Sequence, residues 1–461
     1  MNEVSLSEIL ESRENRAKHQ VELLKRCKNT LICFTLNIAG PVKASPMTDK
    51  VFKEGISLIR QHLERNGCGI DLCETFYKIT GEEAFFAVDR DSNDVKRLML
   101  VIEEKEALGR IFDIDVIDQS GEKITREQLG EKSRTCFICD HAAKVCARSR
   151  CHSVDEVLNK IQVISDSYFR TKFINTVSDI ALRALLFEAA VTPKPGLVDR
   201  NNNGAHSDMD YFTFISSSSV LLPFFSELTE IGINHVGSPV SLLKEIRYTG
   251  QKAESAMYKV TGGVNTQSGL IFSIGLLCSA IGHLYGKNQS YSLKEVVEYE
   301  MQMTQNLLDE LWDRAPENRM TKGKRAFLEY GVTGIRGEAA SGYSSVLLYG
   351  LPVLKRCIAE GLSMNDAGVV TLINLMADTN DTNLITRSDM VKQASVKNEL
   401  QRILASNITP QEIINAAKVL DDDFIKENIS PGGCADLLAI SFFLYFLETE
   451  IMQDSAAVQL K

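Results

Sequence analysis

The stretch "TKFINTVSDIALRALLFEAA", residues 171–190, shows the helical pattern that decides the fold of the second half of the chain, a pattern that begins after residue 153. Its apolar positions recur every three or four residues, which is the spacing of one face of an α-helix. These positions are Phe173, Val177, Ile180, Ala184 and Phe187. The same spacing returns in residues 270–281 and again after residue 436, and no convincing strand follows residue 171. The second half of the chain is therefore expected to be all-α.

The first 165 residues mix helical and strand signals. Four apolar, β-rich runs, "LICFTLNI" (31–38), "AFFAV" (84–88), "RLMLVIE" (97–103) and "IFDIDVI" (111–117), predict an α+β domain with a mixed or antiparallel sheet. Capping-box patterns, "SLSE" (5–8) and "SVDE" (153–156), predict two helix starts. We expect a multidomain protein with domains at 1–165 and 166–461.

Composition limits the class of protein. The chain has 461 residues, of which 44% are hydrophobic, and a net charge of -10. The negative net charge argues against a nucleic-acid partner, because binding to phosphates needs a basic face. The N-terminus lacks an apolar leader, and the longest apolar runs are shorter than the roughly 20 residues that span a bilayer. We expect a cytoplasmic protein with no membrane partner, whose eleven cysteines are mostly reduced.

"GRIFDIDVIDQSG", residues 109–121, is the sharpest motif of the first half. Side chains alternate on a strand, so Asp113 and Asp115 should lie on one face, about 7 Å apart, with Phe112, Ile114 and Val116 on the other. Two such carboxylates can hold Mg²⁺ against a polyphosphate, an arrangement that resembles nucleotidyltransferases. A solvated strand face is the alternative.

"RTCFICDHAAKVCARSRCHS", residues 134–153, combines cysteines with basic residues. Cys136 and Cys139 form a CxxC, and Cys146, Cys151 and His152 follow at irregular spacing. A structural zinc site is one interpretation, but a second CxxC at the usual distance is missing, so buried or unpaired cysteines are favoured. The basic side chains would suit diphosphate oxygens, with a solvated face as the alternative. They are Arg134, Lys144, Arg148 and Arg150.

Four words of the first half, "TLNIAGPVK" (35–43), "GRIFDIDVID", "SRTCFIC" and "CARSRCHS", together resemble apo-citrate lyase phosphoribosyl-dephospho-CoA transferase over roughly residues 1–170. The resemblance implies transfer of a phosphoribosyl-dephospho-CoA unit to a serine of the citrate lyase acyl carrier (γ) subunit, with release of diphosphate. We assign catalysis and metal binding to Asp113 and Asp115. The expected substrate-binding residues are Lys43, Arg110, Arg148 and Arg150.

Five polar, glycine-containing islands separate the helices of the second half. They are residues 188–212, 261–269 ("TGGVNTQSG"), 334–343 ("GIRGEAASGY"), 378–387 ("DTNDTNLITR") and 428–439 ("NISPGGCADLLA"). Repeated Gly with Asn, Thr and Asp indicates backbone held close to a ligand. The sequence therefore predicts that these islands share a binding site.

Two islands carry a more specific prediction. In "NISPGG", Ser430 should cap the following helix, with Gly432 and Gly433 leaving amides open to a phosphate; a plain capped helix is the alternative. In residues 188–212, the prolines should end a helix near residue 190 and present Lys194 to phosphate. The alternative is that Ser207 or Asp208 serves only as the cap of the next helix.

The words "EAAVTPKPGLVD", "GAHSDMD", "GVNT", "GEAASGY", "DTN" and "SPGGCADLLA" resemble the triphosphoribosyl-dephospho-CoA synthase family from residue 171 to the C-terminus. The resemblance implies joining of ATP to 3'-dephospho-CoA with release of adenine. The family commonly has "GVNTHKG" and "HRGG" where this chain has "GVNTQSG" and "TRSD", so Gln267, Ser268 and Thr386 stand where other side chains are usual.

The implied reaction needs carboxylates at the ribosyl centre, a base, and Mg²⁺ on the triphosphate. The carboxylates available in the islands are Glu188, Asp199, Asp208, Asp210, Glu338, Asp378, Asp381 and Asp436. We assign catalysis to Asp199, Asp208, Asp210 and Glu338, and metal binding to Asp208, Asp378 and Asp381. The expected substrate-binding residues are Lys194, Asn265, Thr266, Arg336, Ser430, Gly432 and Gly433.

The sequence thus predicts a bifunctional enzyme that makes and attaches the prosthetic group of citrate lyase. Two alternatives stay open: the equivalent enzyme pair for malonate decarboxylase, and a non-catalytic nucleotide-binding or carrier-docking protein.

Overall fold

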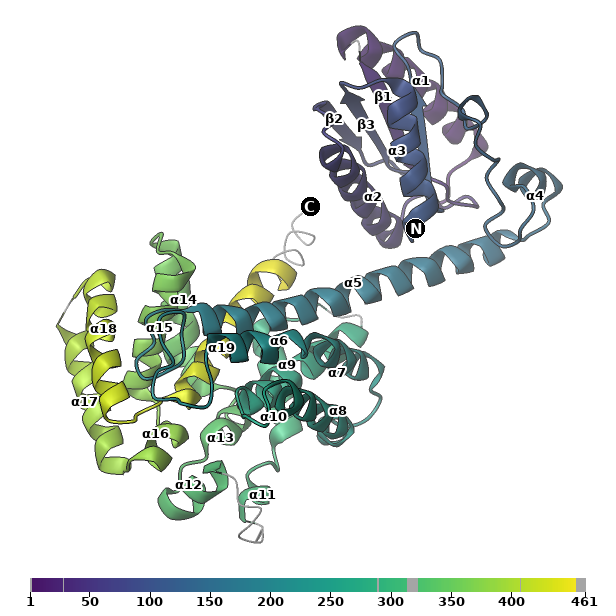
Figure 1. Cartoon of the computed structure of the whole chain (residues 1–461). Helices are drawn as coiled ribbons and strands as arrows, with labels where there is room; N and C mark the ends of the chain where they lie inside the picture. Colours follow the sequence, from purple (N-terminus) through teal and green to yellow (C-terminus); the bar gives the residue numbers. More distant parts are fainter. Residues whose placement is uncertain (1, 28, 288–289, 313–321, 407, 453–461) are drawn as a thin grey trace. The chain divides into compact units, whose positions relative to one another are not determined.

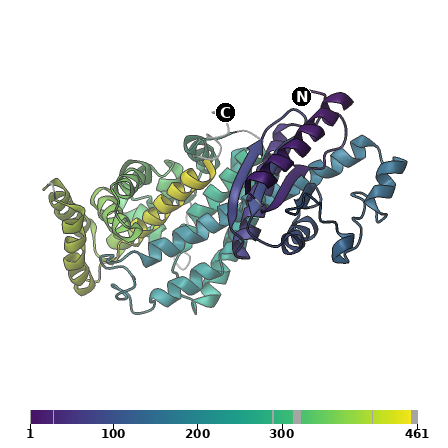
Figure 2. The same ribbon diagram turned by 90° about the horizontal axis from the view of Figure 1, so that it is seen from above.

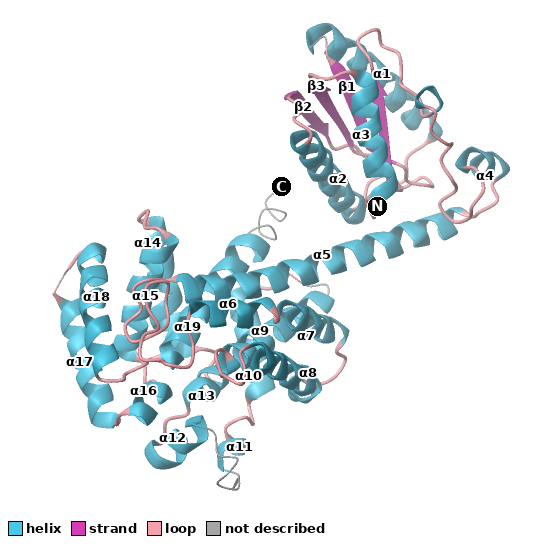
Figure 3. Cartoon of the chain, in the orientation of Figure 1, coloured by secondary structure: helices cyan, strands magenta, loops and turns pink. Residues whose placement is uncertain are grey.

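A computed structural model describes residues 2–27, 29–287, 290–312, 322–406 and 408–452. The chain divides into two compact units, residues 1–172 and 173–461. The division falls inside the helix α5 (Val154–Ala190), which also contains the boundary expected from the sequence, 165/166. All strands of the described chain belong to the first unit (Figure 3). The α+β and all-α predictions are confirmed.

The first unit is a four-stranded antiparallel sheet flanked by helices (Figures 1 and 2). The strand order is β2-β3-β1-β4, which leaves β4 at an edge. The strands are β1 (Thr30–Leu36), β2 (Ile70–Phe76), β3 (Glu83–Val88) and β4 (Phe112–Ile117). The helices are α1 (Leu6–Cys27), α2 (Pro46–Arg65), α3 (Ser92–Lys105), the 3₁₀ turn η1 (Glu127–Leu129), α4 (Ala143–Ser149) and the start of α5.

Alternation along the strands divides the unit into two apolar layers. Ile32, Phe34 and Phe86 join the larger core, to which α2 and α3 contribute. Cys33 and Phe85 point to the opposite face and pack against Leu23 of α1. Both predicted capping boxes are present, Ser5 with Glu8 and Ser153 with Glu156.

One of the predicted β-rich runs is wrong. "RLMLVIE" lies in helix α3, because Val95, Met99 and Ile102 bury one face at helical spacing and Asp91 caps the first turn. Strand β2 was missed, since its exposed and half-buried pattern gives no apolar run.

The second unit is entirely helical over its described residues. Three helices, α9, α15 and α19, are apolar on most faces and therefore lie at its centre, packed by amphipathic neighbours. The elements after α5 are α6 (Tyr211–Ser219), α7 (Leu222–Asn234), α8 (Pro239–Val260), α9 (Ser268–Gly286), α10 (Leu293–Thr304), α11 (Asp309–Trp312), α12 (Lys322–Tyr330), α13 (Gly334–Ala340), the π-helical turn η3 (Val346–Gly350), α14 (Leu351–Ala359), α15 (Met364–Asp378), α16 (Thr382–Arg387), α17 (Met390–Ala405), α18 (Pro410–Lys426), α19 (Gly432–Leu447) and the π-helical turn η4 (Glu448–Met452).

Helix α9 is long and apolar enough to cross a membrane by length and composition alone, with a mean hydropathy of 1.6. Of its 18-residue apolar window, 72% is buried inside the unit. It packs on α7, α8, α10 and α19, as the central helix of a bundle does.

Candidate functional site

The helical unit contains a cavity of 1410 Å³ whose walls come from all five polar islands. This exceeds the roughly 300–1,000 Å³ of an ordinary small-molecule pocket. The predicted site residues that line it are Lys194, Asp208, Asn265, Thr266, Arg336, Glu338, Asp378, Ser430, Gly432 and Gly433. The structure therefore brings together segments up to about 240 residues apart in the sequence, as the prediction of a shared site requires.

Three predicted catalytic or metal-binding aspartates do not line this cavity. Asp199 is buried and accepts the amides of Lys194, Asn201 and Asn202, which holds the 194–204 loop in shape. Asp210 forms a capping box with Thr213 at the start of α6, so neither Ser207 nor Asp208 caps that helix. Asp381 caps α16 through two amides. Each carboxylate thus has a structural hydrogen-bonding role.

Lys194 forms a buried ion pair at the cavity wall. Its Nζ lies 2.5 Å from Glu188 Oε1 and 2.9 Å from the Glu188 carbonyl, and the Lys194 side chain is only 1% exposed. α5 ends at Ala190 as predicted, and the turn that follows folds Lys194 back onto it. The Lys194 ammonium already has an anionic partner in Glu188. The expected contact with phosphate would therefore require Lys194 to bind Glu188 and the phosphate at the same time.

Two other carboxylates lining the cavity have raised pKa values. Desolvation by burial raises the pKa of Glu338 on α13, although Ser345 donates to it from Oγ at 2.5 Å. Burial, with the charges of Glu188 and Asp381, raises the pKa of Asp436 well above its ordinary value. Asp436 receives no hydrogen bond from the part of the chain that the structure describes. Raised pKa values of this kind suit proton transfer near neutral pH.

The close approach of helices α9 and α19 sets the position of Asp436. A Cβ at Gly269 would lie 2.1 Å from Asp436 Oδ2, so only glycine leaves room for that carboxylate. Gly269, at the end of the second island, therefore leaves the space that the Asp436 carboxylate occupies. Its neighbour Ser268 lines the cavity, and its hydroxyl has no hydrogen-bond partner among the described residues.

A polar cluster forms another part of the wall. His206 Nε2 lies 2.8 Å from Ser430 Oγ, and Arg387 Nη2 lies 3.2 Å from His206 Nδ1. Asp208 lies 3.6 Å from the same imidazole, with a side chain that is 60% exposed. The Asp208 carboxylate therefore remains open to a ligand, while His206 and Arg387 orient each other beside it.

The N-terminus of α19 differs from its prediction. Ser430 does not cap this helix, because its hydroxyl bonds His206 instead, and Pro431 occupies the cap position. Asp381 Oδ2 accepts the Cys434 amide at 2.7 Å. The expected phosphate site at Gly432 and Gly433 is thus already partly filled by a protein carboxylate.

Gln267, Ser268 and Thr386, which depart from the family pattern, lie in three different environments. Gln267 is buried and bonds the hydroxyls of Ser217 and Ser218, which ties α6 to the start of α9. Thr386 donates to the Thr382 carbonyl within α16. Of the three unusual side chains, only that of Ser268 lines the cavity.

Arg336, on α13, lines the cavity, and the sequence predicts that it binds substrate. It is half-buried and has no ion pair within the described ranges. Arg247, by contrast, pairs with Glu310 at 2.6 Å. Asp378 lines the cavity at the end of α15 and accepts one hydrogen bond, from Gln401 at 3.3 Å.

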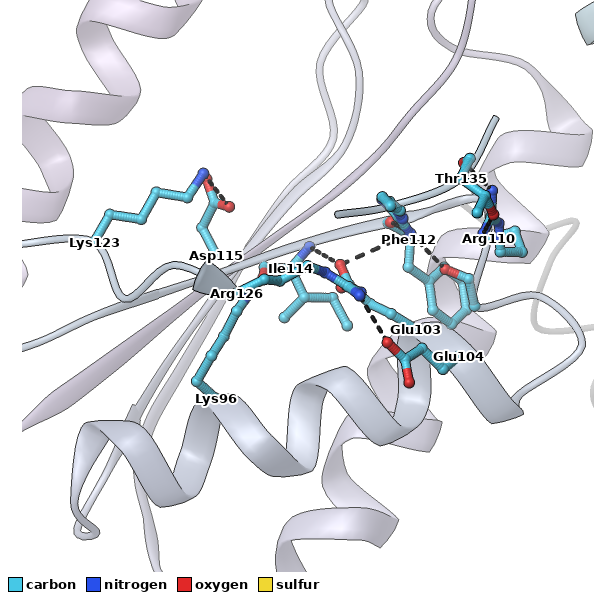
Figure 4. Close-up of polar contacts among 12 residues, drawn as sticks. Lys96, Glu103, Glu104, Arg110, Phe112, Ile114, Asp115, Lys123, Arg126 and Thr135 are labelled. Carbon is cyan, nitrogen blue, oxygen red and sulfur yellow. Dashed lines mark hydrogen bonds and ion pairs between the residues drawn. The ribbon is translucent and has the colours of Figure 1, made fainter. Parts of the chain in front are cut away.

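In the first unit, β4 carries the predicted aspartate pair. Asp113 stands opposite Thr35 and Asp115 opposite Cys33 in the antiparallel register, so both share a face, while Phe112, Ile114 and Val116 enter the core. Desolvation and the like charge of Asp115 raise the pKa of Asp113. Asp115 forms an ion pair with Lys123 (Figure 4). The predicted alternation is confirmed.

The predicted cations of this unit are dispersed. Arg110 donates to the carbonyls of Thr135 and Cys136, at 2.5 and 3.0 Å, so its guanidinium fixes the backbone there (Figure 4). Lys43 is half-buried and donates to the Ile38 carbonyl. Arg148 and Arg150 are exposed at the end of α4. No contact between described residues joins these cations to the aspartate pair.

Comparison with known proteins accounts for both units. The family model described as apo-citrate lyase phosphoribosyl-dephospho-CoA transferase (CitX) matches residues 4–168, and that described as ATP:dephospho-CoA triphosphoribosyl transferase (CitG) matches residues 174–454. The protein CitXG of Haemophilus influenzae is 36% identical over 96% of this chain and 97% of its own length. The chain belongs to this family of CitX–CitG fusions.

Further relatives agree with that assignment. The protein CitXG of Leuconostoc mesenteroides is 32% identical over 96% of this chain and 97% of its own length. A 2-(5''-triphosphoribosyl)-3'-dephosphocoenzyme-A synthase of Haemophilus ducreyi is 35% identical over 67% of this chain and 99% of that protein. The chain is accordingly a transferase of citrate lyase prosthetic-group biosynthesis.

Four residues of the CitG-type cavity were not assigned from the sequence. Asp436 and Glu188 were named as available carboxylates but not selected, and His206 and Arg387 were not proposed as substrate ligands. A signal existed for Asp436: it is the single charge in the otherwise apolar helix "GGCADLLAISFFLYFL", where a buried charge needs a reason. His206 and Arg387 meet only through tertiary structure.

Proposed function

We propose that the CitG-type unit transfers the triphosphoribosyl group of ATP to 3'-dephospho-CoA. The ribosyl C1'–N9 bond of ATP breaks and a bond from C1' to the 2'-oxygen of dephospho-CoA forms. The proton of that 2'-hydroxyl leaves and adenine takes one up. The observation that carries the proposal is the 1410 Å³ cavity, which has room for two nucleotides and is lined by carboxylates with raised pKa values.

One carboxylate accepts the proton of the 2'-hydroxyl, and a second carboxylate donates a proton to the departing adenine. ATP is a β-riboside and the proposed product has an α linkage, so the attacking oxygen enters opposite the departing adenine. Such inversion uses an acid and a base on opposite sides of the sugar. We assign the acid to Asp436, because burial raises its pKa well above the ordinary value, and the base to Glu338, on a different helix. A charged carboxylate beside C1' would also stabilise the oxocarbenium-like transition state.

The triphosphate would bind where cations and exposed carboxylates meet. Arg336 offers a guanidinium that has no carboxylate partner among the residues that the structure describes, and Asp208 and Asp378 offer oxygen ligands that suit Mg²⁺. When bound, Mg²⁺ would neutralise part of the triphosphate charge. Asn265, Thr266 and Ser268 supply neutral donors and acceptors along the same wall.

The CitX-type unit would then use the product. A serine hydroxyl of the citrate lyase acyl carrier gives up its proton and attacks the α-phosphorus of the triphosphate, so that a new P–O bond forms. The bond from the α-phosphorus to the oxygen that bridges it to the β-phosphorus breaks, and diphosphate leaves with that oxygen and the proton. Asp113 and Asp115 fit a divalent cation: desolvation and the like charge of Asp115 raise the pKa of Asp113, and a cation between the two carboxylates would offset that charge. That cation would offset the charge of the leaving diphosphate.

Adenine release tests the first reaction. The intact chain, given ATP, 3'-dephospho-CoA and Mg²⁺, should release one adenine for each dephospho-CoA consumed. Omission of dephospho-CoA should abolish release, which separates transfer from simple hydrolysis of ATP. A chain that binds both nucleotides but releases no adenine would leave only the non-catalytic alternative.

Acceptor choice tests the second reaction. The product, made with labelled dephospho-CoA, should label the carrier subunit of citrate lyase and release diphosphate. Preferential labelling of a malonate decarboxylase carrier would contradict the proposed acceptor.

A further inference from the structure

The segment before α5 contains a cluster of four metal-ligand side chains. Sγ of Cys136, Cys139 and Cys146 and a ring nitrogen of His152 all lie within 4.8 Å of one another. Sγ of Cys139 is 3.5 Å from Sγ of Cys146 and 3.3 Å from Nε2 of His152. We propose that these four side chains bind one Zn²⁺ in a closed, structural site.

The distances match the edges of a coordination tetrahedron. With Zn–S of about 2.3 Å and Zn–N of about 2.0–2.1 Å, neighbouring ligand atoms of a tetrahedral site lie roughly 3.5–3.8 Å apart. The Cys139–Cys146 and Cys139–His152 separations fall within about 0.3 Å of these values. A disulfide would need the two sulfur atoms about 2.05 Å apart, and the four cysteines of this segment are free thiols.

The backbone around the CxxC is shaped to receive a metal. Cys136 N donates to the His141 carbonyl at 2.6 Å, Thr135 pairs with Ala142, and the chain between them turns so that Cys136 and Cys139 face the same point. The Ile138 amide points at Cys136 Sγ from 3.5 Å. Amides directed at sulfur favour the thiolate form, which is the form that binds metal.

Apart from the hydrogen bonds of Arg110 and Arg134 and the packing of Phe137 on the larger core, few contacts hold this segment. Of the side chains that the structure describes in residues 131–153, only Cys146 is buried. Helix α4 has seven residues and no side-chain cap, and Val145 and Ile138 are exposed. A stretch that buries so little apolar surface commonly depends on a metal for its order. Four protein ligands leave no open position, so the site is structural and not catalytic.

The site would connect three parts of the unit. Cys136 and Cys139 follow the backbone that Arg110 holds, Cys146 lies in α4, and His152 directly precedes the Ser153 cap of α5. Metal binding would thus order the stretch that presents Arg148 and Arg150. The sequence analysis favoured unpaired cysteines because a second CxxC is absent. The third and fourth ligands come instead from a helix and from the residue before the next helix, where no fixed spacing is required.

Metal content of the full chain tests the proposal directly and does not depend on activity. Chain purified under reducing conditions without chelators should contain one zinc per molecule by plasma mass spectrometry. Cys139→Ser should lower zinc content by more than about tenfold, because it removes a central ligand. Cys151→Ser is the matched control: Cys151 is exposed, lies outside the cluster, and should leave zinc content unchanged.

A second pair identifies the imidazole ligand. His152→Ala should lower zinc content, whereas His141→Ala should not, although its Nδ1 lies 3.4 Å from Cys139 Sγ. Chelator-stripped full chain should also take up one Co²⁺, with the intense thiolate-to-cobalt absorption of a tetrahedral site. A reduced, folded chain that contains no zinc and takes up no Co²⁺ overturns the proposal. So does iron in place of zinc, or equal loss in the Cys139 and Cys151 variants.

Discussion

The two candidate sites differ in how they hold their carboxylates. In the CitG-type unit, Glu338 and Asp436 line a cavity built from loops far apart in the sequence, and burial raises both pKa values. In the CitX-type unit, Asp113 and Asp115 stand two residues apart on an edge strand, and Asp113 is exposed. The contrast suits the proposed substrates, because nucleotides can enter a cavity whereas a carrier protein must approach an open surface.

The difference also separates two kinds of chemistry. Proton transfer at a sugar carbon needs carboxylates whose pKa values are tuned by burial. Phosphoryl transfer needs little covalent chemistry from the protein and depends on a cation held in place. If each unit has one of these tasks, substitutions should separate the two activities within the single chain.

The largest separation is expected for Asp113→Asn combined with Asp115→Asn. Loss of both cation ligands should slow labelling of the acyl carrier by about a thousandfold, since metal stabilisation of a transition state is worth several kcal/mol. Adenine release should stay at the level of the unaltered chain, and it serves as the internal control for folding. Labelling that survives at more than a tenth of the original rate would contradict the metal role.

Glu338→Gln should have the converse effect. Removal of the proposed base should slow adenine release by about a hundredfold or more, while carrier labelling from supplied intermediate remains unchanged. Glu254→Gln is the matched control, because Glu254 also lines the cavity but is not assigned to the chemistry. Equal losses in the two variants would show that general disturbance of the cavity is the cause.

Arg336→Ala should weaken binding and leave the chemistry largely intact. We expect KM for ATP to rise about tenfold, the equivalent of one charge-assisted contact of about 1.4 kcal/mol, with little change in kcat. Arg247→Ala, at a cavity arginine that is already paired with Glu310, should change KM much less. A fall in kcat without a rise in KM would move Arg336 from binding to transition-state stabilisation.

Sequence reasoning succeeded where the signal was local. The alternation that puts Asp113 and Asp115 on one strand face, the two capping boxes and the end of α5 each depend on a few adjacent residues. The division into an α+β half and an all-α half was equally accessible, because periodicity is a property of short windows.

Sequence reasoning was less informative where a side chain has more than one possible hydrogen-bond partner. Ser430 satisfies the general rule for a helix cap, but His206 lies within 2.8 Å and takes its hydroxyl. Asp199 was predicted to be catalytic and Asp381 to bind metal, and backbone amides nearby bond the oxygens of both carboxylates. The contact of Ser430 is tertiary, and spacing does not encode it. The amides of Asn201 and Asn383, which bond Asp199 and Asp381, are only two residues away in the sequence, so local turn and cap chemistry also has to be weighed against a ligand role.

The smallest predicted effect is a change in thermal stability that depends on pH, and it concerns Asp436. Asp436 has a pKa raised above its ordinary value of 3.8, so the folded chain binds this proton more tightly than the unfolded chain. As the pH rises above 3.8, ionisation costs the folded state stability, and the cost grows until the pH passes the folded pKa. Asp436→Asn removes that cost, and the variant should melt about 2–4 °C above the unaltered chain for each kcal/mol relieved.

The difference should be present at pH 8 and shrink toward pH 4, where the aspartate is protonated in both states. A scanning melt of both chains across this range measures it, and adenine release should fall in the same variant because the proton donor is gone. Asp113→Asn is the comparison from the open site. Desolvation and the charge of Asp115 also raise the pKa of this carboxyl, so the melt should shift in the same direction, but by less, because the exposed Asp113 side chain is partly screened by water. A variant of Asp436 that is both less stable at pH 8 and inactive would mean that the carboxylate has a structural bonding role and is not held at a cost for catalysis.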